Sequence, residues 1–465
     1  MPKGEPRVLR VSCYGYREPA SLIIYDQTEE VSKKAQARHT VARKSKSASP
    51  EQQPACLAGI LPPPISNDDR ALSHLFTYYV GTGEGRGMFW YVPDLLRTSP
   101  SPALQATMKA LGMASMSRMQ TMPDLRRPAA EEYSKALRAT NDALRDPVLA
   151  KSDATLAAVA ALGTYVVRVH EMTMMHGWMN HNQGATKLLE LRGEEQLDSE
   201  LGMELFTVVR LLNVLSNALF RYSMHHSPMI AELSKMAEVK RDANTRPIET
   251  FYELVVRLND LAIQIDKDGK SAENLGPLIG EALHLDADLK LWSMFLGRAW
   301  HSTVIDTPPL PELHVDKNVY TPIRGERYHM YPSLGIASIW NFYRHTRIML
   351  NEMIRSISLR CVEFQRTSEW QQVVSQSATV IDQLVDDVCG GVVFHFISGA
   401  PGLGATLRLQ WPLFIAALCT DRKSAKYAWI LQNLDIIANT TGFQQALSFS
   451  QRLRDGSTKG IIPGS

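Results

Sequence analysis

Residues 201–222 read LGMELFTVVRLLNVLSNALFRY, and this stretch sets the expectation for the whole fold. Its large apolar side chains recur at steps of four and three, at Leu201, Leu205, Val208, Leu212, Leu215, Leu219 and Tyr222. That period places the side chains on one stripe of an α-helix. The stretch therefore predicts an amphipathic helix that buries one side in a core.

The same period returns over residues 336–361, at Ile336, Trp340, Tyr343, Arg347, Leu350, Ile354, Ile357 and Cys361. Arg347 is the one charged member of this second stripe, so it either pairs with an acid or extends its charged head to water. Two shorter helices have marked ends. Asp153 is expected to cap a helix over 154–169, and Gly193 to end a helix over 183–192 in the left-handed conformation.

Strand-like alternation is short and confined to places such as residues 22–25 and 392–397. Helical spacing dominates beyond residue 70, and no fixed-period repeat indicates a solenoid. The expected fold class is all-α, with a large multi-helix domain over residues 70–465. Residues 47–69 are rich in proline and serine and predict a linker. It separates the helical domain from a basic, mostly disordered tail over residues 1–46.

Basic residues are concentrated in that tail. The 465-residue chain has 50 basic and 48 acidic side chains and a formal charge of +2, which by itself favours no class of charged partner. Within the tail, Lys33-Lys34 and, after eight residues, Arg43-Lys44-Ser45-Lys46 resemble a two-part nuclear import signal. A solvated basic tail explains the same residues equally well. Contact with nucleic-acid phosphates through so few charges is expected to be weak and salt-sensitive.

Cysteine usage favours a reducing compartment. The five cysteines are far apart and form no Cys-x-x-Cys pair, so neither a disulfide framework nor a tetrahedral metal site is expected. His170, Glu171, His176 and His181 come closest to a metal-binding group. Histidine spacings of six and five do not share one helix face, so ordinary packing is expected for them. Charged and polar residues interrupt the apolar stretch 390–419, and no membrane span is expected.

No catalytic residue is expected. Residues 399–406 (GAPGLGAT) resemble a phosphate loop, but Ala405 stands where that motif needs lysine. The alternating glycines over residues 81–87 lack the flanking strand and helix of a dinucleotide site, and read as a loop. A nucleophile elbow is also missing from the sequence. Residues 386–387 (Asp-Asp) are as well explained by a solvated helix face.

One segment carries a distinctive pattern. Residues 178–193 read WMNHNQGATKLLELRG, which resembles the W-x-x-H-x-x-G-A-x-x-L-L-x-L-R-G signature of fungus-specific transcription factors. The matching residues are Trp178, His181, Gly184, Ala185, Leu188, Leu189, Leu191, Arg192 and Gly193. Residues 133–147, 328–348 and 410–414 support the resemblance, which covers nearly everything from residue 70 onward. It implies a helical regulatory domain in which the signature residues are mostly packing anchors on buried faces.

Members of this family usually begin with a binuclear zinc cluster, in which six cysteines hold two zinc ions and place a short basic helix in the DNA major groove. Residues 13–17 (CYGYR) and 22–34 resemble the last ligand and the downstream flank of that cluster. Cys13 offers one thiolate, and residues 1–12 contain neither cysteine nor histidine, so no zinc or other cofactor is expected. Either the cluster has been lost, or the true start lies upstream.

The resemblance implies a nuclear transcriptional regulator or co-regulator of a fungus, specific for one pathway such as secondary metabolism. It is expected to act through protein partners, either as a homodimer or with other regulators through helical faces. DNA contact is expected to be indirect or weak. The alternative is a DNA-binding zinc-cluster factor whose N-terminal exon is missing, and the third interpretation is an enzyme or a ligand-binding helical protein. A small-molecule effector stays open.

Overall fold

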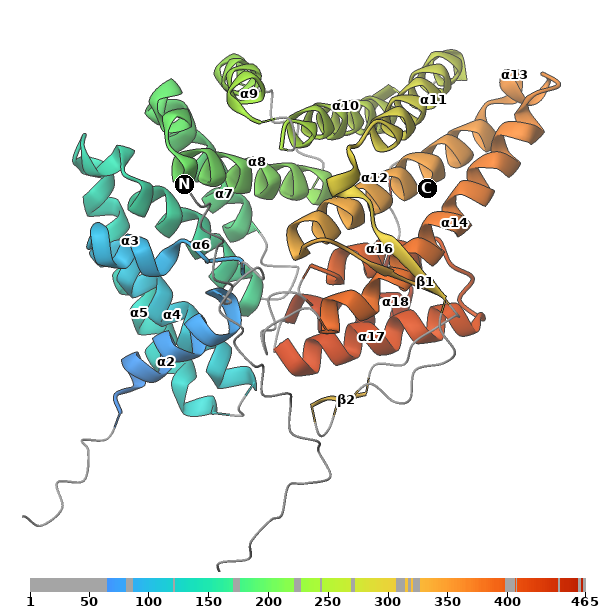
Figure 1. Ribbon diagram of the computed structural model, residues 1–465. Coiled ribbons are helices and arrows are strands. Elements are labelled where there is room, and N and C mark those ends of the chain that lie inside the picture. Colours follow the sequence, from blue (N-terminus) through green and yellow to red (C-terminus); the bar gives the residue numbers. More distant parts are fainter. Residues whose placement is uncertain are drawn as a thin grey trace, which may run out of the picture. The chain divides into compact units, whose positions relative to one another are not determined.

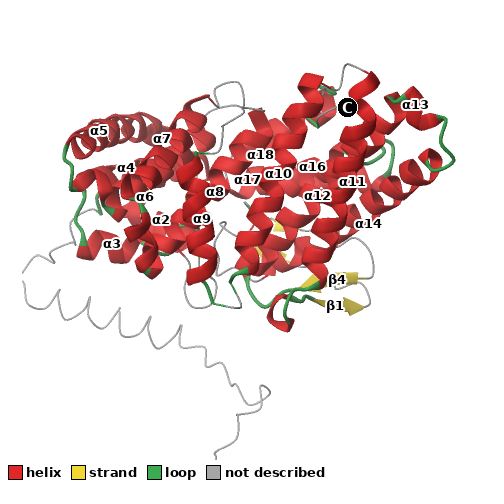
Figure 2. Cartoon of the chain, turned by 90° about the horizontal axis from the view of Figure 1, so that it is seen from above, coloured by secondary structure: helices red, strands yellow, loops and turns green. Residues whose placement is uncertain are grey.

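The computed structural model describes residues 65–80, 87–119, 122–169, 176–220, 227–242, 245–268, 272–306, 314–316, 319–320, 327–397, 406, 408–441, 444–458 and 461–462. These residues are mostly helical, which confirms the all-α fold class (Figures 1 and 2). The first helix begins at Asn67, inside the range assigned to the linker. The tail over residues 1–46 and the strand expected over residues 22–25 lie outside the described residues.

Eight helices contribute to or pack around a first hydrophobic core, which includes Leu104, Met108, Leu156 and Phe206. They are α2 (Asn67–Leu75), α3 (Val92–Thr98), α4 (Pro102–Met119), α5 (Arg126–Arg145), α6 (Asp153–Val169), α7 (His176–Arg192), α8 (Glu200–Phe220) and α9 (Pro228–Lys240). Short helical turns lie between several of them: η3 (Phe76–Val80), η4 (Pro123–Leu125), η5 (Leu149–Lys151) and η7 (Glu194–Asp198). Helix α4 packs on α2, α5 and α6, and α7 packs between α6 and α8.

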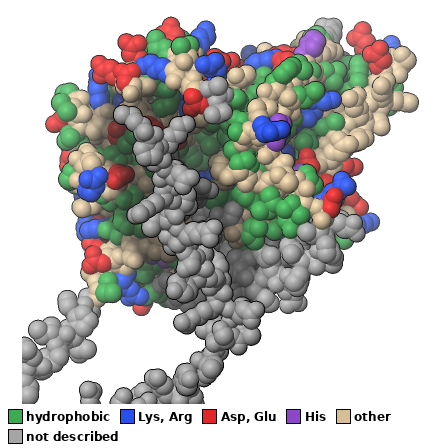
Figure 3. Space-filling view, viewed as in Figure 1, with side chains coloured by type: hydrophobic (Ala, Val, Ile, Leu, Met, Phe, Trp, Pro, Cys, Tyr) green, Lys and Arg blue, Asp and Glu red, His purple; other side chains and the backbone are tan. Residues whose placement is uncertain are grey.

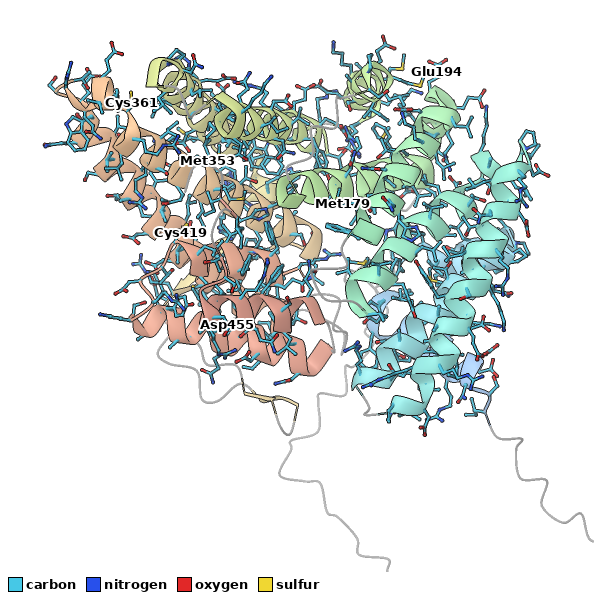
Figure 4. All side chains as sticks on the ribbon, turned by 180° about the vertical axis from the view of Figure 1, so that it is seen from behind. Met179, Glu194, Met353, Cys361, Cys419 and Asp455 are labelled. Atoms are coloured by element: carbon cyan, nitrogen blue, oxygen red, sulfur yellow. The ribbon has the colours of Figure 1, made fainter. Side chains whose placement is uncertain are left out.

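The remaining helices build a second core, which includes Phe251, Leu289, Met353 and Phe414. They are α10 (Pro247–Asp268), α11 (Ala272–Met294), α12 (Leu334–Arg360), α13 (Val362–Gln365), α14 (Trp370–Ile397), α16 (Gln410–Leu418), α17 (Ala425–Thr441) and α18 (Gln444–Asp455), with the turn η8 (Arg298–Trp300). The two long helices α12 and α14 pack along each other (Figure 1). Figure 4 shows Met353 of α12 in the interior of this group.

Among the described residues, four short strands form two antiparallel pairs, β1 (Thr303–Asp306) with β4 (Arg327–Met330) and β2 (His314–Asp316) with β3 (Val319–Tyr320). Strand β4 packs on α14 at two adjacent glycines. A Cβ atom at Gly390 would lie 2.7 Å from Cδ2 of His329, and one at Gly391 would lie 3.1 Å from the Tyr331 hydroxyl. A side chain at Gly390 would therefore require the His329 ring to shift, and one at Gly391 would crowd the Tyr331 hydroxyl.

The two long stripes form helices, as predicted from their spacing. Helix α12 buries Leu350, Ile354 and Ile357 completely. In α8 the side chains are described over residues 200–213, and there the buried side is centred on Leu205, Phe206 and Val209, slightly off the predicted stripe, with Val208 only partly buried. The last members of the stripe, Leu215, Leu219 and Tyr222, lie outside the described side chains. Within the described ranges, no helix combines the length and the apolar character that crossing a membrane requires.

Two local predictions are wrong. Residues 392–397 are the last turns of α14, not a strand, and every side chain from Val392 to Phe396 is buried. A short apolar run of this kind is equally consistent with a helix that is buried all round. Asp153 is the first residue of α6 and does not cap it. The side chain of Ser152 accepts the capping hydrogen bond, from the Thr155 amide at 3.2 Å.

Candidate functional site

The signature residues lie on α7 and at its C-terminal end. Trp178, Ala185, Leu188 and Leu189 are buried in or beside the first core. Trp178 packs over α6, where a Cβ atom at Gly163 would lie 3.1 Å from its ring. Leu191 is 49% exposed, so the interpretation of the signature leucines as buried anchors is wrong at this position. Gly184 is also exposed.

His181 belongs to a small aromatic group between α5, α6 and α7. Its Nε2 atom lies 3.0 Å from the hydroxyl of Tyr133, whose ring stacks on that of Tyr165 at 4.3 Å. Burial lowers the pKa of His181 and raises the pKa of Tyr165 to about 12, so both groups are neutral near pH 7. No group of three or more potential metal ligands occurs among the described residues. The arrangement positions helices and offers no nucleophile.

The end of α7 is fixed by charge and by backbone conformation. Arg192 is buried and donates a hydrogen bond to Asp153 of α6 at 2.5 Å. Gly193 follows with φ 63° and ψ −154°. The positive φ agrees with the left-handed conformation predicted for Gly193. The ψ angle, however, lies outside the left-handed helical region, in a region that glycine alone adopts readily. Gln196 then donates to the carbonyl oxygens of Leu189 and Gly193.

Substitution of Gly193 by alanine is expected to lower the free energy of unfolding by about 1–3 kcal/mol, because alanine is strained in this backbone region. No heavy atom lies within 4 Å of the added Cβ, so the cost comes from the backbone alone. Gly280→Ala is the matched control. Gly280 lies inside α11 with the same open surroundings, and alanine there is expected to stabilise by about 0.5–1 kcal/mol. Urea unfolding of both variants checks the opposite signs.

A buried ion cluster joins α8 to α10. Glu249 accepts hydrogen bonds from Arg210 and from Arg241, each at 2.5 Å, and its side chain is 2% exposed. Arg210 also donates to Ser234 of α9 at 2.7 Å, and Arg241 donates to Thr207 of α8. The guanidinium of Arg210 lies over the rings of Phe206 and Tyr252. The cluster is a structural connection between the two cores, and nothing in the sequence pattern predicted it.

An open groove of about 500 Å³ lies between the start of α10 and the end of α11. Its lining consists of Arg246, Pro247, Thr250, Leu254, Asp288, Leu291, Trp292, Phe295 and Leu296. Leu254, Trp292 and Leu296 are buried, whereas Phe295 is 83% exposed. The indole of Trp292 donates to the carbonyl oxygen of Pro247 at 2.8 Å, which ties the two sides together. Sequence reasoning missed this groove, and the available signal was the apolar run LWSMFL at residues 291–296.

A family model described as "Fungal specific transcription factor domain" matches residues 73–291. The chain carries a fungal specific transcription factor domain. No curated protein and no solved structure matches the chain. The domain contains the signature helix α7, the ion cluster and most of the groove lining. The domain indicates a fungal transcriptional regulator.

Two further polar networks lie beyond the transcription factor domain or at its end. Arg347 of α12 donates two hydrogen bonds to the carboxylate of Asp286 of α11, at 2.7 and 2.8 Å. Of the two expectations for this arginine, pairing with an acid is the one that the structure shows. Arg344 is buried beside the hydroxyl of Tyr331, and its Nε lies 3.9 Å from Asp387. Asp387 therefore faces a charged partner and not only solvent. Asp386 pairs with Lys426 at 2.7 Å.

Several expected site residues fall outside the described ranges. They are Cys13, the basic residues Lys33, Lys34, Arg43, Lys44 and Lys46, the glycines of residues 399–404, and His170 with Glu171. His176 is the first residue of α7, and its side chain is likewise not described. The structure therefore brings His181 together with Tyr133 and gives no geometry for the other histidines of that window.

Proposed function

We propose that this chain is a nuclear regulator of fungal gene expression that acts through protein partners. The observation that carries the proposal is the transcription factor domain over residues 73–291. The open groove at the end of that domain supports it, because exposed apolar surface next to a hollow is typical of protein interaction sites. On the face drawn in Figure 3, acidic and basic side chains are interspersed among hydrophobic ones. Such a surface favours protein contacts over binding to a phosphate backbone.

Contact with DNA through these 465 residues is proposed to be indirect or weak. Residues 1–55 contain one cysteine, Cys13, and a single thiolate cannot hold the two zinc ions of a binuclear cluster. The basic residues of the first segment, at positions 33–46, support nuclear import. Control of one metabolic or secondary-metabolite pathway is proposed from the family resemblance.

A second candidate function is a DNA-binding regulator with its own zinc cluster. Residues 13–17 and 22–34 favour it, because they resemble the last ligand and the flank of such a cluster. Mapping the 5′ end of the transcript separates the two candidates. An upstream in-frame segment with Cys-x-x-Cys spacing would establish the second.

Two measurements on the 465-residue chain test the leading proposal. In a gel shift with promoter DNA, we expect weak, salt-sensitive binding that added zinc does not change. A fluorescent fusion is expected in the nucleus, and substitution of alanine at Lys33, Lys34, Arg43, Lys44 and Lys46 is expected to redistribute it to the cytoplasm. Sequence-specific DNA binding that depends on zinc would contradict the proposal, and so would a fusion excluded from the nucleus.

A further inference from the structure

The end of α11 presents a continuous apolar surface. Leu283, Ala287, Leu291 and Met294 follow one another at steps of four, four and three, and all four are exposed. This spacing places them on one stripe of the helix, on a side that the second core does not use. Phe295 extends the stripe and is 83% exposed. A stripe of this length is expected to be covered, because its exposure to water costs roughly 25 cal/mol for each Å² of apolar surface.

The groove described above lies directly beside this stripe. Its floor is formed by side chains that are nearly inaccessible, Leu254 at 7%, Trp292 at 8% and Leu296 at 6% exposed. The hydrogen bond from Trp292 to Pro247 holds the floor in place. A projecting ring, Phe295, and a hollow that accepts apolar side chains therefore occur on the same surface.

A surface that carries both an exposed ring and a groove able to accept such a ring is complementary to a second copy of itself. In a symmetric dimer the same patch from two copies meets, so that each projection enters the hollow of the other copy. The polar rim agrees with this arrangement. It offers one basic residue, Arg246, and one acidic residue, Asp288, which itself pairs with Arg257 at 2.7 Å. A rim of a single sign would favour a partner of opposite charge, whereas a mixed rim suits an antiparallel copy of itself.

We propose that a second copy of this chain covers the α10–α11 groove, with Phe295 of each copy inserted into the groove of the other. The two α11 stripes then pack against each other across the twofold axis. Arg246 of one copy faces Asp288 of its partner. The inference deepens the proposed function, since it names one of the protein partners through which that function acts.

Sedimentation velocity over a range of concentrations tests the dimer with the full chain. Wild type is expected to sediment as a reversible dimer, and Phe295→Asp is expected to weaken the dimer at least roughly 30-fold, the effect of losing a hot-spot aromatic side chain. Val148→Asp is the matched control, because Val148 is 78% exposed at a site outside the groove lining. That variant is expected to dimerise like wild type. Circular dichroism verifies that both variants keep their helices.

A charge exchange tests the arrangement within the dimer. Arg246→Asp and Asp288→Arg are each expected to weaken association, and the double variant to recover most of it, because the exchange restores opposite charges across the axis. A wild-type chain that stays monomeric at every concentration would overturn the proposal. A dimer that Phe295→Asp leaves unchanged would overturn it as well, since association would then use another face. Neither outcome affects the gel-shift and localisation results. Sedimentation can therefore contradict the dimer while the proposed function stands, and the gel shift and localisation can contradict the proposed function while the dimer stands.

Discussion

Glu249→Ala is expected to lower the free energy of unfolding by about 3–5 kcal/mol, which is the cost of leaving buried charges without their partner. Glu249 lies between Arg210 and Arg241 and accepts a hydrogen bond from each, and the three side chains are at most 8% exposed. Removal of the carboxylate leaves two guanidinium groups close together in a poorly solvated site. Urea unfolding followed by circular dichroism measures the change.

The matched control is Glu253→Ala on the same helix. Glu253 is exposed, and its substitution is expected to change stability by less than about 0.5 kcal/mol. Simultaneous replacement of Arg210, Arg241 and Glu249 by apolar residues of similar size is expected to recover most of the loss, because no buried charge then remains. If Glu249→Ala were as mild as its control, the cluster would contribute nothing to the junction of α8 and α10.

The second large effect is a loss of stability in mild acid. His345 and His395 are buried in the second half of the chain, and burial lowers the pKa of His345 to about 3 and that of His395 to about 4. The charges of Arg408 and Arg344 lower the pKa of His395 further. Both imidazoles stay neutral in the folded protein, whereas in the unfolded chain they take up protons below a pKa of about 6.5.

Because the unfolded state binds more protons, stability falls as the pH falls from about 6.5 towards these lower pKa values. Each histidine is expected to cost about 2 kcal/mol between neutral pH and pH 5, and the pair about 4 kcal/mol. That is a large part of the stability of an ordinary domain, about 5–15 kcal/mol. Urea unfolding at a series of pH values between 7 and 5 checks the direction and the slope.

Replacing each histidine by a residue that does not titrate tests whether the two histidines cause the loss of stability in acid. His395→Asn and His345→Asn are each expected to reduce the pH slope by about one proton, whatever their effect on stability at pH 7. Asparagine keeps a polar group able to bond the backbone carbonyl oxygens of Gly391 and Asn341 that lie 3.1 and 2.8 Å from the two imidazoles. Unchanged slopes in both variants would show that other groups cause the acid sensitivity.

Local rules predicted the helices well and their partners poorly. The spacing of residues 201–222 and 336–361 predicted α8 and α12, because a helical period is a property of neighbouring residues. The same spacing could not tell whether Arg347 meets water or an acid, since Asp286 is 61 positions away in the chain. The cap assigned to Asp153 was wrong because its carboxylate is used by Arg192, 39 positions away, and Ser152 takes its place.

The candidate site shows the same division. The signature of residues 178–193 pointed to the transcription factor domain that the family model matches over residues 73–291. The groove beside Phe295 was not predicted, because the run LWSMFL reads as core from its composition. Whether each of its side chains is covered depends on which helices pack against α11.

The sequence by itself determined the helical class, the position of the long helices and the kind of domain, since all three follow from residue types at short, fixed spacings. The tertiary structure alone decided that residues 392–397 stay helical, that Glu249 lies between two arginines, and that Phe295 is left exposed beside a hollow. These features depend on contacts between segments far apart in the chain, and local patterns carry no information about which distant segments meet.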